Sequence, residues 1–208
     1  MKNDYQPEGN YYDKYHSANP IVKWMMGHYF ADLQELLPEK KKGIRILEAG
    51  CGEGEVSGFV AGHYGDACTM DAFDVSDKVI AKAREEYPHI SFETGNIYEM
   101  KQGGYDLVLC CEVLEHLTEP EKALKELERV TSEYLIVSVP REPIWRILNM
   151  LRGKYWADLG NTPGHIQHWS KRKFLLFLQK AEMEIVCVKR PFPWTMVLLK
   201  KERGTSER

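Results

Sequence analysis

Ile44-Arg-Ile-Leu-Glu-Ala-Gly-Cys-Gly-Glu-Gly54 is the stretch of sequence that decides how the rest of the chain folds. Its first four residues predict a short buried strand, and the alternating Gly50, Gly52 and Gly54 predict a turn that opens directly into a helix. Glycines let a ligand lie on the backbone, and we expect free N–H groups at the start of the helix to face that ligand. A strand followed by such a turn opens a nucleotide-binding α/β domain.

The spacing of the glycines separates two kinds of nucleotide-binding loop. A dinucleotide fingerprint, G-x-G-x-x-G, would need glycine where the chain has Glu55, so the spacing disfavours an NAD-dependent oxidoreductase. The run from Glu48 to Gly54 instead resembles motif I, (D/E)-x-G-x-G-x-G, of class I S-adenosylmethionine-dependent methyltransferases. The resemblance covers about residues 10 to 200. It implies that the cofactor lies against Glu48, Gly50, Cys51, Gly52 and Gly54.

Length and composition fit an ordinary globular protein. The 208 residues predict one domain over 1–208, with 1–40 as an N-terminal helix and lid and 141–169 as a substrate-facing insert. The net charge of −3 gives no reason to expect a nucleic-acid partner. No apolar run is long enough to span a membrane, and the five cysteines include no C-x-x-C, so we expect reduced thiols and a cytoplasmic location. The sequence carries no signal for an oligomeric state.

Strand and helix patterns alternate along the chain. Helices are predicted over 20–37, 56–64, 78–87, 121–131, 141–152 and 170–181, and strands over 44–47, 68–75, 90–93, 105–111, 134–139, 183–189 and 196–200. The helix over 141–152 has an apolar stripe of Ile144, Trp145, Ile147, Leu148 and Leu151. Five alternations predict a doubly wound, mostly parallel sheet, and the last two strands predict the antiparallel hairpin that is usual for the family. The expected fold is therefore an α/β, seven-stranded, Rossmann-like methyltransferase fold.

Further cofactor contacts are expected at the carboxyl ends of the strands, where ligands of such sheets bind. Asp74 ends the second strand and can accept hydrogen bonds from both ribose hydroxyls, with Val75 beside it. Ser76 or Asp77 can cap the next helix, which would leave Asp74 for the ligand. An ordinary helix cap is the other interpretation of Asp74.

Two short segments carry further resemblances. Gly95-Asn96-Ile97 resembles the family segment that contacts adenine, which implies that Asn96 bonds the amine and Ile97 covers the ring; a plain turn is the alternative. Asn10-Tyr-Tyr-Asp-Lys-Tyr-His16 resembles N-terminal segments of similar methyltransferases. That likeness implies that Tyr11, Tyr12 or Tyr15 folds over the cofactor, although the segment could instead belong to a helix packed on the sheet.

Glu112-Val-Leu-Glu-His116 carries the densest group of reactive side chains. If a helical turn begins at Glu112, then Glu112, Glu115 and His116 share one face, and His165 or His168 from the later loop could complete a divalent-cation site. The ligand set Glu112, Glu115, His116 and His168 would suit Mg²⁺, Mn²⁺, Zn²⁺ or Fe²⁺.

The same run resembles the E-x-x-E-H of ubiquinone-biosynthesis O-methyltransferases and of small-RNA 2′-O-methyltransferases, in which a later histidine completes a metal site. Similar runs occur in methyltransferases that have no metal. In a metal-free site His116, His165 or His168 would be a general base. A structural interpretation also stays open, in which Glu115 and His116 bond to each other or cap a helix.

These observations predict an S-adenosylmethionine-dependent methyltransferase that acts on a small molecule, at an oxygen atom. Methyl transfer is an in-line displacement in which the cofactor carries the reactivity, and the protein positions the acceptor and removes its proton. The alternatives are a metal-dependent RNA 2′-O-methyltransferase, which needs a basic groove, and a cofactor-binding domain without catalysis.

Overall fold

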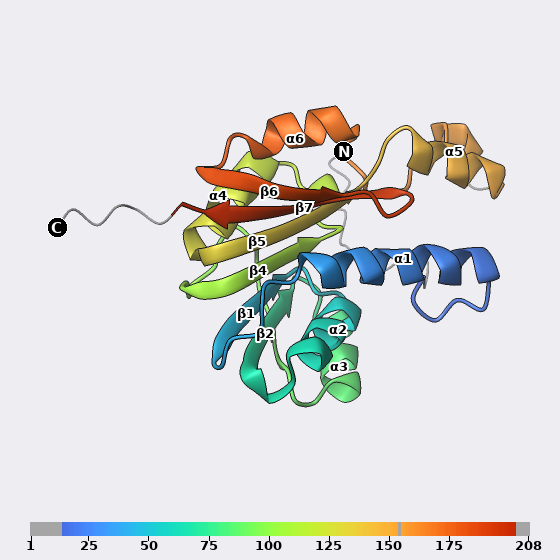
Figure 1. The fold of residues 1–208 in the computed structure, drawn as a ribbon. Helices are drawn as coiled ribbons and strands as arrows, with labels where there is room; N and C mark the ends of the chain where they lie inside the picture. The colour runs from blue at the N-terminus through green and yellow to red at the C-terminus, as the bar shows by residue number, and fades with distance from the viewer. Residues whose placement is uncertain (1–13, 154, 203–208) are drawn as a thin grey trace.

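The computed structural model describes residues 14–153 and 155–202, which form a seven-stranded sheet with helices on both faces (Figure 1). The strand order is β3-β2-β1-β4-β5-β7-β6. The strands are β1 (Ile44–Ala49), β2 (Cys68–Asp74), β3 (Ser91–Thr94), β4 (Tyr105–Cys111), β5 (Thr131–Pro140), β6 (Met183–Lys189) and β7 (Trp194–Lys201). β1 to β5 pair in parallel, whereas β7 runs antiparallel to both β5 and β6. The predicted fold, with its C-terminal hairpin, is confirmed.

Two layers of helices cover the sheet. The α-helices are α1 (Pro20–Leu36), α2 (Glu55–Tyr64), α3 (Asp77–Glu86), α4 (Pro120–Val130), α5 (Ile144–Leu151) and α6 (Lys171–Leu178). α1, α2 and α3 contribute to one apolar cluster, and α4 and α6 contribute to the other. Along β4, Leu107, Leu109 and Cys111 enter the first cluster while Val108 and Cys110 enter the second. This alternation follows from the two-residue period of a strand and explains why β4 is apolar throughout.

The connection after β5 departs from the expected pattern. α5 has one buried residue, Asn149, whereas Ile147 and Leu151 of the predicted apolar stripe are exposed. Ile147 and Leu151 therefore face away from the sheet, whereas Trp145 of the same stripe packs against the first apolar cluster. α5 lies beyond the carboxyl end of β5 rather than over either face of the sheet (Figure 1). None of the helices in the described part of the chain has both the length and the apolar character that crossing a bilayer requires.

Candidate active site

The three glycines after β1 are needed for different structural reasons. All have positive φ, at 80° for Gly50, 54° for Gly52 and 90° for Gly54. A Cβ at Gly50 would lie 2.4 Å from Cγ2 of Val113, and one at Gly54 would lie 2.9 Å from the Phe92 ring. A Cβ at Gly52 would meet nothing within 4 Å. Two glycines therefore permit close packing beneath the turn, and Gly52 leaves an open surface on which a ligand can lie.

The backbone amides of this turn are used within the fold. The N–H groups of Gly50 and Cys51 donate to the carbonyl of Phe73 at 2.8 and 2.9 Å. The N–H of Gly52 donates to Oδ2 of Asp74 at 3.0 Å. The end of β2 thus satisfies these three amides, and the amides expected to face the ligand are those at the start of α2.

Asp74 closes the turn between β2 and α3. Its Oδ1 accepts from the backbone N–H of Ser76 at 3.0 Å, whereas the Ser76 side chain makes no capping bond and the Asp77 carboxylate accepts from Thr94. Ser76 is the N-cap residue of α3, as expected, although its side chain accepts no capping bond. Each carboxylate oxygen still has a second lone pair, so Asp74 can hold the turn and accept from ribose hydroxyls together. Val75 beside it is 57% exposed.

Glu48 lies beneath the turn rather than on its open side. Its carboxyl is buried and accepts hydrogen bonds from the hydroxyl and backbone N–H of Ser57, in the first turn of α2. Burial, with the nearby charge of Asp74, raises the pKa of Glu48 to about 8. This carboxyl therefore fixes the start of α2 from the core side, which differs from the expected position against the cofactor. Cys51 is likewise buried in the core.

The predicted adenine segment forms a turn. Oδ1 of Asn96 accepts from the N–H of Tyr98 at 3.0 Å, and the Asn96 carbonyl accepts from Glu99. Ile97 is buried in the core with Leu47 and Val108 rather than presented to a ligand. The turn interpretation describes these contacts, and the Asn96 side chain is the exposed part of the segment.

Glu112 belongs to a group that joins β4, β5 and β7. It has a left-handed backbone, with φ of 61°, so the helical turn begins only at Leu114 and the expected shared face does not form. Its carboxylate accepts from Nε1 of Trp194 and, at 3.3 Å, from the hydroxyl of Ser138. The ammonium of Lys14 lies 3.7 Å away and within 5.4 Å of the Trp194 ring centroid.

The charges of this group are coupled. Burial disfavours the charged form of Lys14, but Tyr15, Glu112 and Glu115 outweigh it and the pKa of the lysine is raised. Burial raises the pKa of Glu112 even though Lys14 and Trp194 favour its charged form. Neither Lys14 nor Trp194 was expected from the sequence. The one available signal was a lysine within the aromatic run of residues 10–16.

The N-terminal tyrosines can be assessed only in part. Tyr15 is half-buried, with its ring centroid 6.1 Å from that of Phe30 in α1, and burial raises its pKa to about 12. The ammonium of Lys14 lies 5.2 Å from the Tyr15 ring. Tyr11 and Tyr12 lie outside the described residues.

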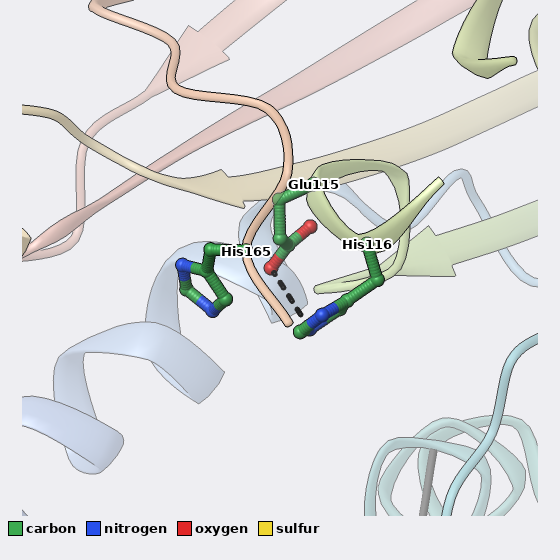
Figure 2. A group of neighbouring side chains, drawn as sticks. All are labelled: Glu115, His116 and His165. Carbon is green, nitrogen blue, oxygen red and sulfur yellow. Dashed lines mark ion pairs between the residues drawn. The ribbon is translucent and has the colours of Figure 1, made fainter. Parts of the chain in front are cut away.

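Glu115, His116 and His165 converge at the same edge of the sheet, with the Glu115 carboxyl lying between the two imidazoles (Figure 2). One ligand atom from each residue lies within 4.8 Å of the others. The backbone carbonyl of Glu115 accepts from the N–H groups of Ile166 and Gln167 at 2.8 and 2.9 Å. These two bonds hold the later loop against the turn after β4, which is why residues 49 positions apart in the sequence meet.

The Glu115 carboxyl has no hydrogen-bond donor among the described residues, although both of its oxygens are buried. Burial, with the charge of Glu112, raises its pKa well above the usual value. Burial also lowers the pKa of His116, and it lowers that of His165 to about 3. The Nδ1–H of His116 donates to the carbonyl of Gly164 at 3.0 Å, which leaves Nε2 as the lone-pair atom of the neutral ring.

Two members of the expected four-residue ligand set lie apart from this group and have other partners. Glu112 bonds to Trp194 and Ser138, and Nδ1 of His168 lies 3.6 Å from Oε1 of Glu142. Among the described residues, the side chains close enough together to hold an ion are Glu115, His116 and His165.

Comparison with known proteins gives one family match and several partial relatives. A family model described as "Methyltransferase domain" matches residues 21–188. Norajmaline N-methyltransferase of Rauvolfia serpentina is 36% identical over 98 residues, which are 44% of this chain and 34% of that protein. Magnesium-protoporphyrin O-methyltransferase of Rhodobacter capsulatus is 25% identical over 139 residues, which are 64% and 61% of the two chains. The chain thus spans less than two thirds of the length of each.

Solved structures share the fold. Magnesium protoporphyrin IX methyltransferase of Synechocystis PCC 6803, with bound S-adenosylhomocysteine, has a TM-score of 0.66 at 18% identity and covers 89% of both chains. The [4+2]-cyclase SpnF has a TM-score of 0.67 at 17% identity, covering 94% of this chain and 87% of its own. Since one of these proteins is named for a different reaction, the fold alone does not decide the chemistry.

Proposed function

The chain belongs to the methyltransferase domain family, and from that membership we propose that it transfers the methyl group of S-adenosylmethionine to a small-molecule acceptor. The observation that carries the proposal is the bond between Asp74 and the amide of Gly52. This bond joins the open surface of the glycine turn to a carboxylate at the next strand end, where an α/β sheet of this type binds a nucleoside.

In this proposal the adenosyl part of the cofactor lies across the carboxyl ends of β1, β2 and β3. Asp74 accepts from the ribose hydroxyls with its remaining lone pairs, and the exposed Val75 and Asn96 line the adenine side. The methionine part extends over Gly52 toward the end of β4, where Glu112 is held by Lys14 and Trp194. Glu48 acts indirectly, by fixing the start of α2.

We infer an oxygen acceptor from the imidazoles beside this position. The S–CH₃ bond breaks, a C–O bond forms in line with it, and the hydroxyl proton passes to a neutral base. Nε2 of His116 is the best placed, because its Nδ1–H is held by Gly164 and burial keeps the ring neutral. His165 supports it from the insert of residues 141–169, which faces the acceptor, and His168 has a separate partner in Glu142.

A divalent cation is a second candidate component, and one observation favours it. The buried Glu115 carboxyl lacks a donor among the described residues while two imidazoles converge on it. One oxygen and two nitrogen ligands fit Zn²⁺, Mn²⁺ or Fe²⁺ better than Mg²⁺. A cation held by Glu115, His116 and His165 would lower the pKa of an acceptor hydroxyl. Without it, the same residues form the metal-free base described above.

Calorimetric titration with S-adenosylhomocysteine tests the main proposal. Saturable binding of one equivalent is expected, and its absence would reject the assignment. Incubation with labelled S-adenosylmethionine and a panel of phenols, alcohols and amines then separates a methyltransferase from a cofactor-binding domain without transfer. Adding RNA to the panel separates the RNA-modifying alternative.

A further inference from the structure

The insert of residues 141–169 carries an exposed apolar surface. It consists of Ile147 and Leu151 on α5, which are 47% and 78% exposed, and of Trp156 and Leu159, which are 65% and 67% exposed. Ile147 and Leu151 are four residues apart and therefore share one face of the helix. Trp156 and Leu159 lie in and directly after the short helix η3 (Trp156–Asp158). We refer to these four residues as the α5 surface.

The two halves of the α5 surface are fixed to each other. Nε of Arg146 donates to the carbonyl of Leu159 at 2.9 Å, and Nδ2 of Asn149 donates to the carbonyl of Gly160 at 2.9 Å. A Cβ at Gly160 would lie 2.1 Å from the carbonyl oxygen of Arg146, so the backbones are in close contact. Large apolar side chains held outward on a fixed element usually mark an interaction surface.

The segment that carries this surface is rich in basic residues. Residues 141–173 contain seven Lys or Arg against two Asp or Glu, whereas the whole chain has a net charge of −3. Arg152, at the end of α5, and the run Lys171-Arg-Lys173, at the start of α6, are exposed. β5 enters α5 at its carboxyl end and α6 begins on that side, so the basic residues and the α5 surface share one end of the molecule (Figure 1).

We propose that the α5 surface docks on an anionic lipid bilayer. Exposed leucine, isoleucine and tryptophan beside lysine and arginine are the combination that places a short helix in the headgroup region of a membrane. The net positive charge complements anionic headgroups and opposes pairing of two copies through the same face. The protein would bind as a peripheral protein, since apolar side chains on one face suffice for interfacial binding.

Docking would place the bilayer next to the proposed acceptor position. The inner face of α5 carries Trp145, whose Nε1 donates to Oγ1 of Thr162 at 2.9 Å and whose ring stacks on His165 at 6.1 Å between centroids. Asn149 donates to the same threonine oxygen at 3.0 Å. One helix therefore presents its outer face to lipid and supports the His165 loop with its inner face.

Cosedimentation of the full chain with vesicles tests the proposal. We expect binding to phosphatidylcholine vesicles that contain about one third phosphatidylglycerol, and little binding to phosphatidylcholine alone. Ile147→Glu with Leu151→Glu should lower the partition coefficient about tenfold or more, since two aliphatic side chains leave the lipid. Val186→Glu, at a similarly exposed apolar residue in the middle of β6, is the matched control and should bind like the parent.

A charge variant gives a second measurement on a chain whose apolar residues are unchanged. Lys171→Gln with Arg172→Gln should weaken binding to the anionic vesicles and reduce its salt dependence. The proposal is overturned if the parent binds neither vesicle, or if both variants bind like the parent. It is also overturned if ultracentrifugation shows a parent dimer that Leu151→Glu dissociates, because a second copy would then cover the surface. Titration with S-adenosylhomocysteine is independent of these outcomes and reports on the proposed function alone.

Discussion

The ammonium of Lys14 lies 3.7 Å from Oε2 of Glu112, an atom that also accepts a hydrogen bond from Trp194. The pair joins the segment before α1 to the carboxyl ends of β4 and β7. Removing either partner leaves the other buried without its counter-charge. We therefore expect Lys14→Met and Glu112→Gln each to lower the free energy of unfolding by about 1–3 kcal/mol, with a coupling energy of about 1 kcal/mol or more in the double-mutant cycle.

Urea unfolding of the four chains measures this coupling. Lys180 and Glu121 supply the control, since their charged atoms are 2.9 Å apart but both side chains are more than half exposed. The cycle of Lys180→Met and Glu121→Gln should give a coupling of about 0.5 kcal/mol or less. Equal couplings for the two pairs would show that the buried contact contributes nothing specific.

Gly52 is predicted to be the glycine that the cofactor needs. Gly52→Ala puts a methyl group into the open space above the turn and strains a residue with φ of 54°, at a cost of about 1–2 kcal/mol. S-adenosylhomocysteine affinity should fall by about tenfold or more, and the melting temperature should fall by about 2–8 °C from the strain alone. Gly62→Ala in α2 also meets open space but lacks the positive φ, so it should leave affinity unchanged and stabilise the helix by about 0.5–1 kcal/mol. Unchanged affinity in Gly52→Ala would place the cofactor elsewhere.

Asp74 is predicted to have two roles that one substitution can separate. Asp74→Asn keeps an acceptor for the Gly52 or Ser76 amide but removes the charge and one acceptor oxygen offered to the ribose. Affinity for S-adenosylhomocysteine should fall about 10- to 100-fold, while the melting temperature falls by only a few degrees. Asp66→Asn, at an exposed position before the other end of β2, is the control. If the two variants bind S-adenosylhomocysteine equally well, Asp74 serves only to close the turn after β2.

The fold could be predicted from the sequence because its signals are local. The apolar alternation of β4 and the glycines after β1 depend on residues close together in the chain. β4 and β6 were predicted to the residue, β1 was predicted two residues too short, and most other ends differ by one to three positions. These patterns survive in the structure because burial on both faces of a parallel sheet leaves few other residues acceptable.

The site was predicted less well because its partners are distant in sequence. Glu115 meets His165 rather than His168 because the carbonyl of Glu115 holds the loop at residues 166 and 167. No spacing rule reveals that bond. The left-handed backbone of Glu112 likewise separates its side chain from that of Glu115. The sequence predicted a helical turn that would have placed both side chains on one face. The bonds of the Gly50, Cys51 and Gly52 amides were not foreseen for the same reason, since their acceptors lie on β2.

The buried carboxyl of Glu48 predicts a specific pH dependence of stability. Its pKa of about 8 in the folded chain exceeds the 4.5 of an unperturbed glutamate, so the folded state holds this proton more tightly between those values. The contribution of Glu48 to stability is therefore present at acid pH and is lost as the pH rises through 8. Glu48→Gln keeps a neutral acceptor for Ser57, so it should reduce the loss of unfolding free energy between pH 5 and pH 8 by about 3 kcal/mol.

Urea unfolding at the two pH values measures this difference. Glu85→Gln, at an exposed residue of α3, should follow the parent at both pH values. If Glu48→Gln also follows the parent, the Glu48 carboxyl is already ionised in the folded chain. The cost of burying that charge is then offset by its hydrogen bonds at the start of α2.

A metal titration can show whether the converging side chains bind a cation. Variants of His165 and His168 then show which of the two is a ligand. Titration of the chain with Zn²⁺ or Mn²⁺, without acceptor, should show one bound equivalent if Glu115, His116 and His165 hold a cation. His165→Ala and Glu115→Gln should then weaken binding about tenfold or more, because each removes one of three ligands. His168→Ala removes only the contact to Glu142 and should leave affinity within about twofold. Loss in His168→Ala but not in His165→Ala would restore the ligand set expected from the sequence. No binding by the parent would leave the metal-free base, in which His116→Gln abolishes transfer while S-adenosylhomocysteine still binds.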